Sequence, residues 1–290
     1  MISSTFTVHG VRFAEYHALF VLHNVIFETQ DDSFSQFRQS LNAAVQVWAI
    51  TYEDDLIGYT AVWEVPGVAG LLEFNGGILP QYRKRGAGSL LLNHLITNCK
   101  SLPFHTLSCS VADVDTAVAH FLDHHHFWVE HEEWTLLLKN LATLPAIPPS
   151  RCLLRTYPRQ KAVAEFIKLY DASFADTPWN QPFTAAEVDN MLNKAIDIKF
   201  LLVDGKSVGF AWVHYAGQGA TLEPIGIVQT AQGKGYGRIL LTTILHMLAN
   251  ENVPAVSLGV WANNDKALAL YQSVGFEPSD KMTYLAISLK

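Results

Sequence analysis

The most informative segment for predicting the fold is Gln232-Gly233-Lys234-Gly235-Tyr236-Gly237-Arg238. It joins an apolar segment with strand character, Thr221–Val228, to an amphipathic segment with helical spacing, residues 235–249. Glycines allow such a turn to adopt positive φ and to approach a ligand closely. The helix that follows directs free N–H groups and the positive end of its dipole at the turn, so a pyrophosphate is the ligand we expect there.

Two common phosphate-binding motifs do not fit this turn. A Walker A loop would end in Gly-Lys-Ser/Thr, and a dinucleotide fingerprint would need Gly-x-Gly-x-x-Gly within a βαβ unit. A tight strand-to-helix connection without any ligand has the same composition, so the turn alone is a weak signal. Other segments of the sequence are needed to distinguish a phosphate-binding turn from a tight connection without a ligand.

The chain repeats the turn once. A shift of 149 residues places it on Arg83-Lys84-Arg85-Gly86-Ala87-Gly88, and no gap is needed between residues 71–127 and residues 220–276. The aligned pairs include Gly235 with Gly86, Gly237 with Gly88, Leu240-Leu241 with Leu91-Leu92, Val260 with Val111 and Phe276 with Phe127. One constant register over this length predicts an internal duplication.

A proline-rich segment lies between the repeats. Residues 141–150 contain three prolines and no charged side chain, which is typical of an extended linker. The chain of 290 residues is long enough for two domains. We therefore expect one domain over residues 1–140, a linker over 141–150 and a second domain over 151–290.

The second half shows the expected order of elements most clearly. The expected helices are Arg159–Ala172, Ala185–Ala195, Gly235–Ala249 and Asp265–Val274. The expected strands are Lys199–Val203, Gly209–Tyr215, Thr221–Val228, Ala255–Val260 and Thr283–Leu289, with a turn at Asp204-Gly205-Lys206 between the first two. Helices come first and then alternate with strands. This predicts an α/β (α+β layered) fold, with a mixed, mostly antiparallel sheet flanked by helices in each half.

Composition excludes several classes of protein. Hydrophobic residues make up 49% and charged residues 16%, which favours a globular chain, and the formal net charge of −7 argues against a nucleic-acid partner. No apolar run reaches the roughly 18 residues of a membrane span, and the polar first ten residues do not resemble a signal peptide. Three cysteines without paired spacing favour reduced thiols and a cytoplasmic location. Residues 1–145 carry 7 basic and 15 acidic side chains, whereas residues 151–290 carry 13 basic and 12 acidic side chains. We therefore expect the second half to tolerate a polyanionic ligand better than the first half.

Two motifs in the second half resemble those of one enzyme family. The turn fits the pattern (Gln/Arg)-x-x-Gly-x-(Gly/Ala) at Gln232, Gly235 and Gly237, and again at Arg83, Gly86 and Gly88. Downstream, Asn264-x-x-Ala267-x-x-Leu270-Tyr271-x-x-x-Gly275-Phe276 is similar to the second signature of the same family. The chain thus resembles a tandem protein of the GNAT superfamily of N-acyltransferases, an arrangement shared with mycothiol synthase.

The resemblance implies acetyl-CoA as the co-substrate, bound in a V-shaped opening between two central parallel strands. In the second half the coenzyme-binding residues would be Ile227, Gln232, Gly233, Lys234, Gly235, Tyr236, Gly237, Arg238 and Asn264. In the first half they would be Ile78, Arg83, Arg85, Gly86, Ala87 and Gly88. Main-chain N–H groups of the turn would hold the pyrophosphate, and Asn264 would touch the pantetheine arm.

Acetyl transfer to an amine requires a base for the amine proton and an acid for the leaving thiolate. By resemblance, Tyr271 would lie near the coenzyme sulfur and act as the acid; the alternative is a core aromatic on an apolar helix face. Glu223 is a single carboxylate in an apolar run, and many GNAT enzymes use an acid on this strand as the base through water. The alternative is a solvated residue at an irregular strand position beside Pro224.

The first half departs from the pattern. At the 149-residue shift, Leu122 replaces Tyr271 and Phe74 replaces Glu223, while Asp115 and His126 replace Asn264 and Gly275. Glu73 is one residue away and would point to the opposite strand face. We therefore expect a degenerate first domain, structural or coenzyme-binding, and catalysis in the second half.

The acceptor is expected to be a small-molecule or peptide primary amine. By resemblance it would approach over the first two helices of the second half and their loop, where Asp176 could attract a cation and Trp179 and Phe183 could wall a pocket; an ordinary packed loop is the alternative. His120 and His124 have i, i+4 spacing, but histidines at a helix C-terminus also complement its dipole, so we expect no metal.

The leading hypothesis is thus an acetyl-CoA-dependent N-acetyltransferase that works by direct transfer, without nucleic-acid or membrane partners. The alternative is a non-catalytic acyl-CoA-binding or interaction protein, in which both halves are scaffolds. Retention of Tyr271 and Glu223 in the second half favours the enzyme.

Overall fold

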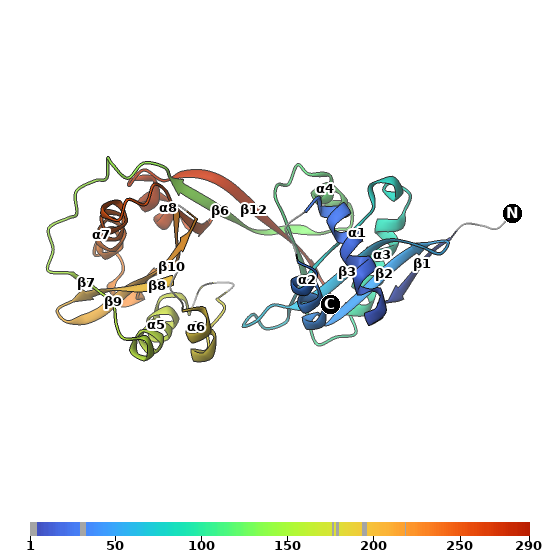
Figure 1. Cartoon of the computed structure of the whole chain (residues 1–290), viewed down its shortest axis with the longest axis horizontal. Coiled ribbons are helices and arrows are strands. Elements are labelled where there is room, and N and C mark those ends of the chain that lie inside the picture. Colours follow the sequence, from blue (N-terminus) through green and yellow to red (C-terminus); the bar gives the residue numbers. More distant parts are fainter. Residues whose placement is uncertain (1–4, 30–32, 176, 178–179, 193–195, 218) are drawn as a thin grey trace. The chain divides into compact units, whose positions relative to one another are not determined.

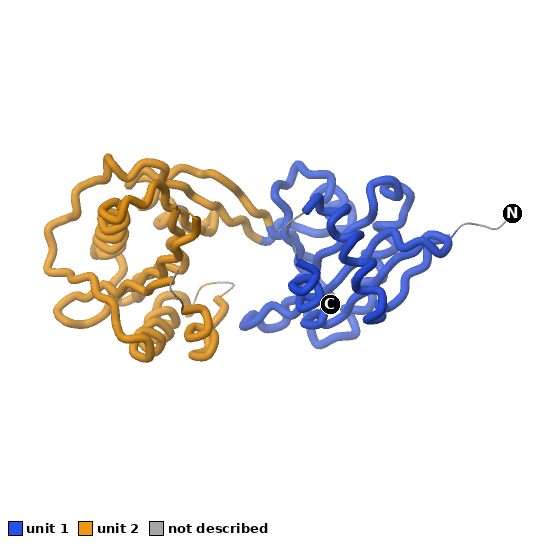
Figure 2. Tube along the Cα trace, viewed as in Figure 1, with its two compact units in different colours: residues 1–130, 284–290 blue, residues 131–283 orange. Residues whose placement is uncertain are grey.

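The computed structural model describes residues 5–29, 33–175, 177, 180–192, 196–217 and 219–290. The chain forms two compact units (Figure 2). Unit 1 contains residues 1–130 and 284–290, and unit 2 contains residues 131–283. None of the described helices is long and apolar enough to cross a membrane.

Unit 1 is a mixed sheet with helices on both faces. Its elements, in chain order, are β1 (Phe6–Gly10), α1 (Tyr16–Phe27), α2 (Phe34–Ala43), β2 (Gln46–Tyr52), β3 (Asp55–Glu64), β4 (Leu71–Ile78), α3 (Ala87–Cys99), β5 (Thr106–Val111), α4 (Ala117–His124) and the start of β6 (Trp128–Leu138). The strands β1 to β4 pair antiparallel in order, and β4 and β5 are parallel. One core cluster joins the sheet to α1 and α2, and another joins it to α3 and α4.

Unit 2 repeats this plan. Its elements are β7 (Leu153–Arg155), α5 (Arg159–Phe174), α6 (Ala185–Met191), β8 (Ile196–Val203), β9 (Lys206–Ala216), β10 (Gly219–Ile227), α7 (Tyr236–Asn250), β11 (Val256–Trp261), α8 (Asp265–Gln272) and most of β12 (Glu277–Ser288). Helices α5 and α6 lie on one side of the strands and α7 and α8 on the other (Figure 1). The expected fold class, two tandem domains with mixed and mostly antiparallel sheets, is confirmed.

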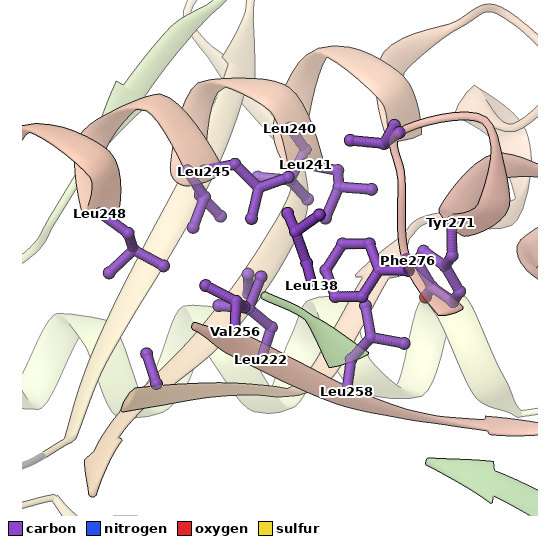
Figure 3. Packing of buried hydrophobic residues seen from close by; sticks show 14 of the residues in the cluster. Leu138, Leu222, Leu240, Leu241, Leu245, Leu248, Val256, Leu258, Tyr271 and Phe276 are labelled. Atoms are coloured by element: carbon purple, nitrogen blue, oxygen red, sulfur yellow. The ribbon is translucent and has the colours of Figure 1, made fainter. Parts of the chain in front are cut away.

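The amphipathic pattern of α7 explains how the helix is held. Leu240, Leu241, Leu245 and Leu248 are fully buried. Figure 3 shows these leucines facing the strand residues Leu222, Val256 and Leu258, with Tyr271 and Phe276 at one end of the cluster. Burial of each such leucine stabilises the fold by about 2 kcal/mol, so α7 is fixed firmly on the sheet and positions the turn that precedes it.

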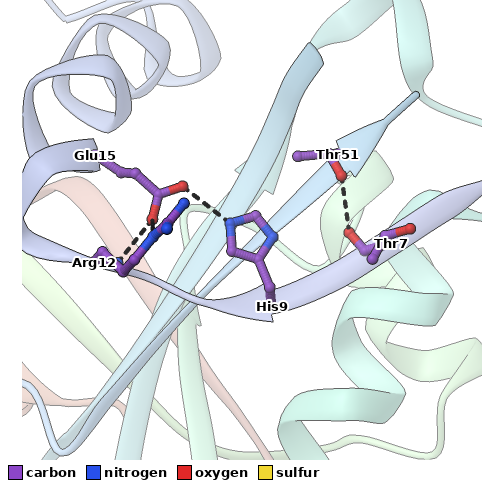
Figure 4. A network of polar contacts seen from close by, with 5 residues as sticks. All are labelled: Thr7, His9, Arg12, Glu15 and Thr51. Atoms are coloured by element: carbon purple, nitrogen blue, oxygen red, sulfur yellow. Dashed lines mark hydrogen bonds and ion pairs between the residues drawn. The ribbon is translucent and has the colours of Figure 1, made fainter. Parts of the chain in front are cut away.

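A polar network fixes the start of α1 in unit 1 (Figure 4). The Arg12 backbone N–H donates to Glu15 Oε2 at 2.8 Å, and His9 Nε2 lies 3.1 Å from Glu15 Oε1. Thr51 Oγ1 donates to the Thr7 carbonyl oxygen at 3.4 Å on the neighbouring strand. The backbone hydrogen bond from Arg12 is the main reason that the pKa of Glu15 is lowered, so the carboxylate stays ionised in this network.

The last strand of each repeat is exchanged between the units. Residues Glu133–Leu138 of β6 pair antiparallel with β11 in unit 2. The end of β12 lies beside β5 in unit 1, where Leu285 and Leu289 join the core and the Leu289 N–H donates to the His105 carbonyl oxygen at 2.9 Å. Residues 141–150 therefore lie within unit 2. The domain limits expected at residues 140 and 151 describe the sequence repeat, and they stay a prediction.

Most predicted elements are confirmed, with shifts of a few residues. Asp204 and Gly205 have φ of 48° and 78°, as the expected turn requires, and Gly275 has a φ of 106° after α8. Helix α6 ends at Met191, and residues 193–195 of the predicted Ala185–Ala195 helix lie outside the described residues. Strand β12 begins at Glu277, six residues before the predicted Thr283. The sequence pattern missed this first part because it is exposed and carries polar residues rather than an apolar pattern.

Candidate active site

The two central parallel strands of unit 2 separate where the site is expected. Ala220 pairs with Val256 and Thr221 with Ser257, and β10 continues beyond these pairs to Ile227. The register between β10 and β9 also shifts between Leu222 and Ile225. A bulge of this kind re-aims side chains and ends regular pairing. The opening therefore begins at Glu223.

The glycine-rich turn closes one end of this opening. Gly233 and Gly235 have φ of 74° and 81°, which favours glycine at both positions. A Cβ atom at either residue would meet no atom within 4 Å, so this surface is open to a ligand. Within the described residues no side chain caps α7, and its first N–H groups face the turn. Such features are compatible with an anion, and pyrophosphate binding at this turn stays a prediction.

Polar side chains hold the turn in shape. Gln232 Nε2 donates to the Ile227 carbonyl oxygen at 3.0 Å, and Lys234 Nζ donates to the Thr230 carbonyl oxygen at 3.0 Å. Arg238 Nη2 donates to Ser273 Oγ at 2.6 Å and so links α7 to the end of α8. The turn is thus ordered before any ligand binds, and two cationic side chains lie beside it.

Glu223 lies over the neighbouring strand at Gly259. A Cβ atom at residue 259 would lie 2.8 Å from Glu223 Oε1 and 3.0 Å from Oε2. Residue 223 as a whole is exposed, although its carboxylate group is packed against β11. Desolvation by the surrounding atoms raises its pKa, and the nearby charge of Glu133 raises it further. Glu133 in turn accepts a hydrogen bond from Trp261 Nε1 at 2.9 Å.

Tyr271 lies on α8 and is 7% exposed. Burial raises its pKa to about 12, and the charge of Glu223 adds to this effect, so the phenol is protonated at neutral pH. Its ring lies 6.0 Å from that of Phe276, centroid to centroid. Tyr271 is therefore a core aromatic, as the alternative interpretation held, and its role as the acid stays a prediction.

Asn264 has a structural role in this site. Its Oδ1 accepts a hydrogen bond from the Ala267 N–H at 3.2 Å and caps the start of α8. The residue is exposed, and the expected contact with the pantetheine arm stays a prediction.

Unit 1 reproduces the turn but not the polar residues. Arg83 Nε donates to the Ile78 carbonyl oxygen at 2.9 Å, the counterpart of the Gln232 bond, and Gly86 has a φ of 88°. The register between β3 and β4, both fully described, is constant, so the bulge of β10 has no counterpart there. Leu122, which aligns with Tyr271 at the 149-residue shift, is 2% exposed. The turn, β4 and α4 line a cavity of about 530 Å³.

The residues expected near the acceptor are only partly described. Asp176 and Trp179 lie outside the described residues. Phe183 packs into an aromatic cluster, with ring centroids 4.9 Å from Tyr170, 5.5 Å from Phe166 and 6.1 Å from Trp212. This packing agrees with the interpretation of Phe183 as part of an ordinary packed loop, and its role as a pocket wall stays a prediction.

The described part of the chain contains no group of three or more His, Cys, Asp or Glu side chains arranged to hold a metal ion. His125, next to the expected pair His120 and His124, instead lies with its Nε2 2.9 Å from Ser89 Oγ.

Sequence reasoning missed three residues of this site. Gly259 makes room for the Glu223 carboxylate, Ser273 holds Arg238, and Glu133 raises the pKa of Glu223. A glycine inside the mostly apolar segment Val256–Trp261 was a visible sign of a close approach by another group. The other two residues gave no local signal.

Comparisons with known proteins agree with this geometry. The model of the Acetyltransferase (GNAT) family matches residues 14–127 and again residues 163–276. The chain is 29% identical over 229 residues to a mycothiol acetyltransferase of Nocardioides sp., covering 71% of this chain and 77% of that protein. A mycothiol acetyltransferase of Renibacterium salmoninarum is 29% identical over 256 residues, covering 79% of this chain and 75% of the relative.

Solved structures share the fold over the whole chain. A GCN5-related N-acetyltransferase of Sphaerobacter thermophilus has a TM-score of 0.69 at 16% identity and covers 98% of this chain and 96% of its own. A tandem GNAT protein from the clavulanic acid biosynthesis pathway has a TM-score of 0.68 at 16% identity, with 99% and 98% covered. Two family matches in tandem, with the fold and the repeated turn, show that this chain belongs to the GNAT family of acetyltransferases.

Proposed function

We propose that this chain is an acetyl-CoA-dependent N-acetyltransferase that acetylates a small-molecule primary amine by direct transfer in unit 2. The observation that carries the proposal is the opening between β10 and β11, where Glu223 lies at the bulge of β10 and the glycine-rich turn follows the same strand. The charge of Glu223 contributes to the raised pKa of Tyr271, which supports a role for both residues at this opening.

The proposed role of the turn is to hold the coenzyme pyrophosphate. The open surface at Gly233 and Gly235 and the free N–H groups of α7 support this role. Lys234 and Arg238 add positive charge beside the phosphates. In this pose the pantetheine arm runs along the free edge of β10 near Ile227, where the strand has backbone groups beyond its last pair with β11.

Glu223 is the proposed base, acting through water. Its raised pKa makes it a stronger proton acceptor than an ordinary carboxylate. The acceptor reacts as the neutral amine, its ammonium proton having gone to solvent; the nitrogen attacks the thioester carbonyl and forms a tetrahedral oxyanion, while Glu223 takes a second proton from the nitrogen through water. Collapse of this oxyanion breaks the carbon–sulfur bond.

Tyr271 is the proposed acid. Its protonated phenol donates to the thiolate as charge develops on the sulfur, giving free coenzyme A and the N-acetyl product. The proton on Glu223 then restores the phenol through solvent, so the proton taken from the amine balances the proton given to the thiol. Leu122 and Phe74 at the matching places of unit 1 can perform neither step.

The acceptor that we propose is an amine of the mycothiol type, because the relatives that cover most of this chain are named mycothiol acetyltransferases. The proposed location is the cytoplasm, in keeping with the free thiols of Cys99, Cys109 and Cys152.

The test is turnover with acetyl-CoA and a broad panel of small-molecule primary amines that includes thiol-bearing ones. We expect thiol release in equal amount to N-acetyl product, with both detected in the same reaction by thiol titration and mass spectrometry. Tight binding of the coenzyme without acetylation of any amine in a broad panel would instead favour the non-catalytic acyl-CoA-binding protein.

A further inference from the structure

The strand registers show that the 149-residue shift does not hold along the whole of β4 and β10. Ile78 and Ile227 are equivalent in space, because each accepts a hydrogen bond from the first residue of the turn that follows it. Ile78 pairs with Gly58 of β3, and Ile227 pairs with Gly209 of β9. Residues at equal distances from these two pairs therefore occupy equivalent places in the two units.

The structural counterpart of Glu223 is Asn75, although the sequence shift aligns Glu223 with the preceding residue. Three positions along the neighbouring strands from the isoleucine pairs, Glu223 and Pro224 stand together opposite Trp212, because the bulge of β10 lies there. At the same place in unit 1, Asn75 stands alone opposite Ala61. The bulge thus inserts one residue into the second repeat.

Pairing with the next strand of each sheet gives the same result. Thr221 pairs with Ser257 of β11, and Glu73 pairs with Ser108 of β5. The two serines are 149 residues apart, whereas Thr221 and Glu73 are 148 residues apart. Glu73 therefore stands at the place of Thr221. It lies two residues before Asn75, on the same face of the strand.

A polar cavity of about 330 Å³ lies at this place in unit 1. It is lined by Ser40, Trp63, Glu73, Phe74, Asn75 and Ser110. Ser110 aligns with Gly259, the residue that lies beneath the Glu223 carboxylate in unit 2. The cavity thus matches the surroundings of Glu223, with an amide in place of the proposed base and a carboxylate two residues away.

The side chains of this cavity suit a small cation. An alkylammonium group carries three N–H donors, for which the Glu73 carboxylate and the Ser110 hydroxyl are acceptors. The Trp63 ring offers a face for a cation, and its Nε1 donates to the Ser40 carbonyl oxygen at 2.9 Å, which holds the ring in place. Residues 1–145 carry 15 acidic and 7 basic side chains, and this excess also favours a cation over an anion.

We propose that this cavity of unit 1 binds a small primary amine in its ammonium form. Glu73 neutralises the charge, Ser110 accepts an N–H, and the Trp63 ring covers the carbon that bears the nitrogen. The volume lies at the lower end of the range for ligand sites, which limits the ligand to a few carbon atoms. The inference goes beyond the proposed function, which concerns unit 2.

The experiment is an NMR titration of the isotope-labelled full chain at pH 7 with 3-aminopropan-1-ol. The indole N–H resonance of Trp63 is the reporter, and its absence from the spectrum of Trp63→Phe assigns it. We expect the amine to shift this resonance to saturation. Propane-1,3-diol is the neutral control and should bind at least about tenfold more weakly, because it lacks the charge that Glu73 neutralises.

Three variants test which side chains bind the amine. Glu73→Gln keeps the shape of the side chain and removes its charge, so the amine should bind at least about tenfold more weakly. Glu64→Gln is the matched control, since Glu64 is an exposed carboxylate on β3 that does not line the cavity, and the affinity should change by less than about twofold. Ser110→Leu fills the cavity from an exposed position and should abolish the shift, which keeps the test decisive where Glu73→Gln does not fold. Melting temperature shows that each variant is folded.

Three results would each overturn the inference. They are the absence of a saturable shift of the Trp63 resonance, equal affinities for the amine and the diol, and an affinity for the amine that Glu73→Gln or Ser110→Leu leaves unchanged in the folded protein. Failure of the proposed function is distinguishable, because the titration contains no coenzyme. A lack of acetyl transfer by unit 2 leaves this inference standing, and a lack of binding in unit 1 leaves the proposed function standing.

Discussion

Glu132 and Lys281 occupy the same position in the two repeats, 149 residues apart, and form an ion pair of 3.0 Å within unit 2. The pair joins the strand of one repeat to the strand of the other, because β6 and β12 are neighbours in the sheet. Thr283 Oγ1 also donates to Glu132 Oε1 at 3.3 Å, and Lys281 Nζ lies 5.8 Å from the centre of the Trp134 ring. The exchange of strands is thus held by side chains as well as by backbone pairing.

The strength of this pair can be measured with a double-mutant cycle. Glu132→Gln, Lys281→Met and the double variant should give a coupling free energy of about 1 kcal/mol, since both side chains are partly buried. Denaturant unfolding of the four proteins provides the four free energies. The surface pair Arg159–Asp189, at 53% and 50% side-chain exposure, is the matched control and should show weaker coupling. Equal coupling in both pairs would contradict the argument.

The strand exchange shows what the sequence could not predict. The turn, the repeat and most helices follow from local patterns, namely glycines at fixed spacing and apolar periodicity. The partner of a strand is a tertiary choice. Leu136 and Leu138 of β6 and Leu285 of β12 have the same apolar character, so either strand could complete either sheet by pattern alone.

As with the fold, the sequence predicted the locally visible residues of the candidate site but not the residues that reach it from distant parts of the chain. Glu223 and Tyr271 stand out because a carboxylate in an apolar run and a motif tyrosine are visible in one sequence. Glu133 is not, because it reaches the site from β6, 128 residues before its partner Trp261. The raised pKa values of Glu223 and Tyr271 depend on such long-range neighbours and on burial, which the sequence does not contain.

Removal of either proposed catalytic group should lower turnover. Glu223→Gln and Tyr271→Phe each keep the shape of the side chain, so kcat should fall by about 10²-fold or more while the coenzyme still binds. Steady-state kinetics with acetyl-CoA and a genuine acceptor measure kcat, and calorimetry measures the coenzyme affinity. If both variants turned over as fast as the parent, neither residue would have the role proposed here.

Gly259 should be required for the position of Glu223. Alanine at this residue places a Cβ atom within about 3 Å of the carboxylate, so Glu223 has to move. We expect a fall in kcat of roughly tenfold, the loss typical of a misplaced catalytic group. The effect should vanish in a Glu223→Gln background. Gly10→Ala, where the added Cβ meets no atom within 4 Å, is the control and should leave kcat unchanged.

The pH dependence should report the environment of Glu223. Its pKa lies above the ordinary value of 4.5, and a base must be ionised to act, so kcat/KM should fall as the pH falls through this raised pKa. Glu133→Gln keeps an oxygen for Trp261 and removes a negative charge, so the acid limb should move to lower pH. A profile from pH 4 to pH 9 of both proteins checks this. An unshifted limb in Glu133→Gln would show that Glu133 does not act on Glu223.

The same shift has a consequence for stability. A carboxyl with a raised pKa in the folded state favours folding at low pH and loses this contribution as the pH rises through the folded-state value. Glu223→Gln does not titrate. It should therefore have a higher free energy of unfolding than the parent at neutral pH, with the difference shrinking toward pH 4.

Alanine substitution at Gly235, compared with the same substitution at Gly205, separates the effect of backbone strain on stability from the effect of a blocked ligand surface on coenzyme binding. Gly235 and Gly205 have φ of 81° and 78°, and a Cβ atom at either would meet no atom within 4 Å. Alanine at each position should therefore destabilise the fold by a similar amount, about 1 kcal/mol. Gly235→Ala should in addition raise the KM for acetyl-CoA about tenfold or more, because its methyl group occupies the surface that the pyrophosphate approaches. Gly205→Ala, in the turn between β8 and β9, should leave KM unchanged. Equal KM values in the parent and both variants would mean that the coenzyme does not approach Gly235, and would move the proposed phosphate site away from this turn.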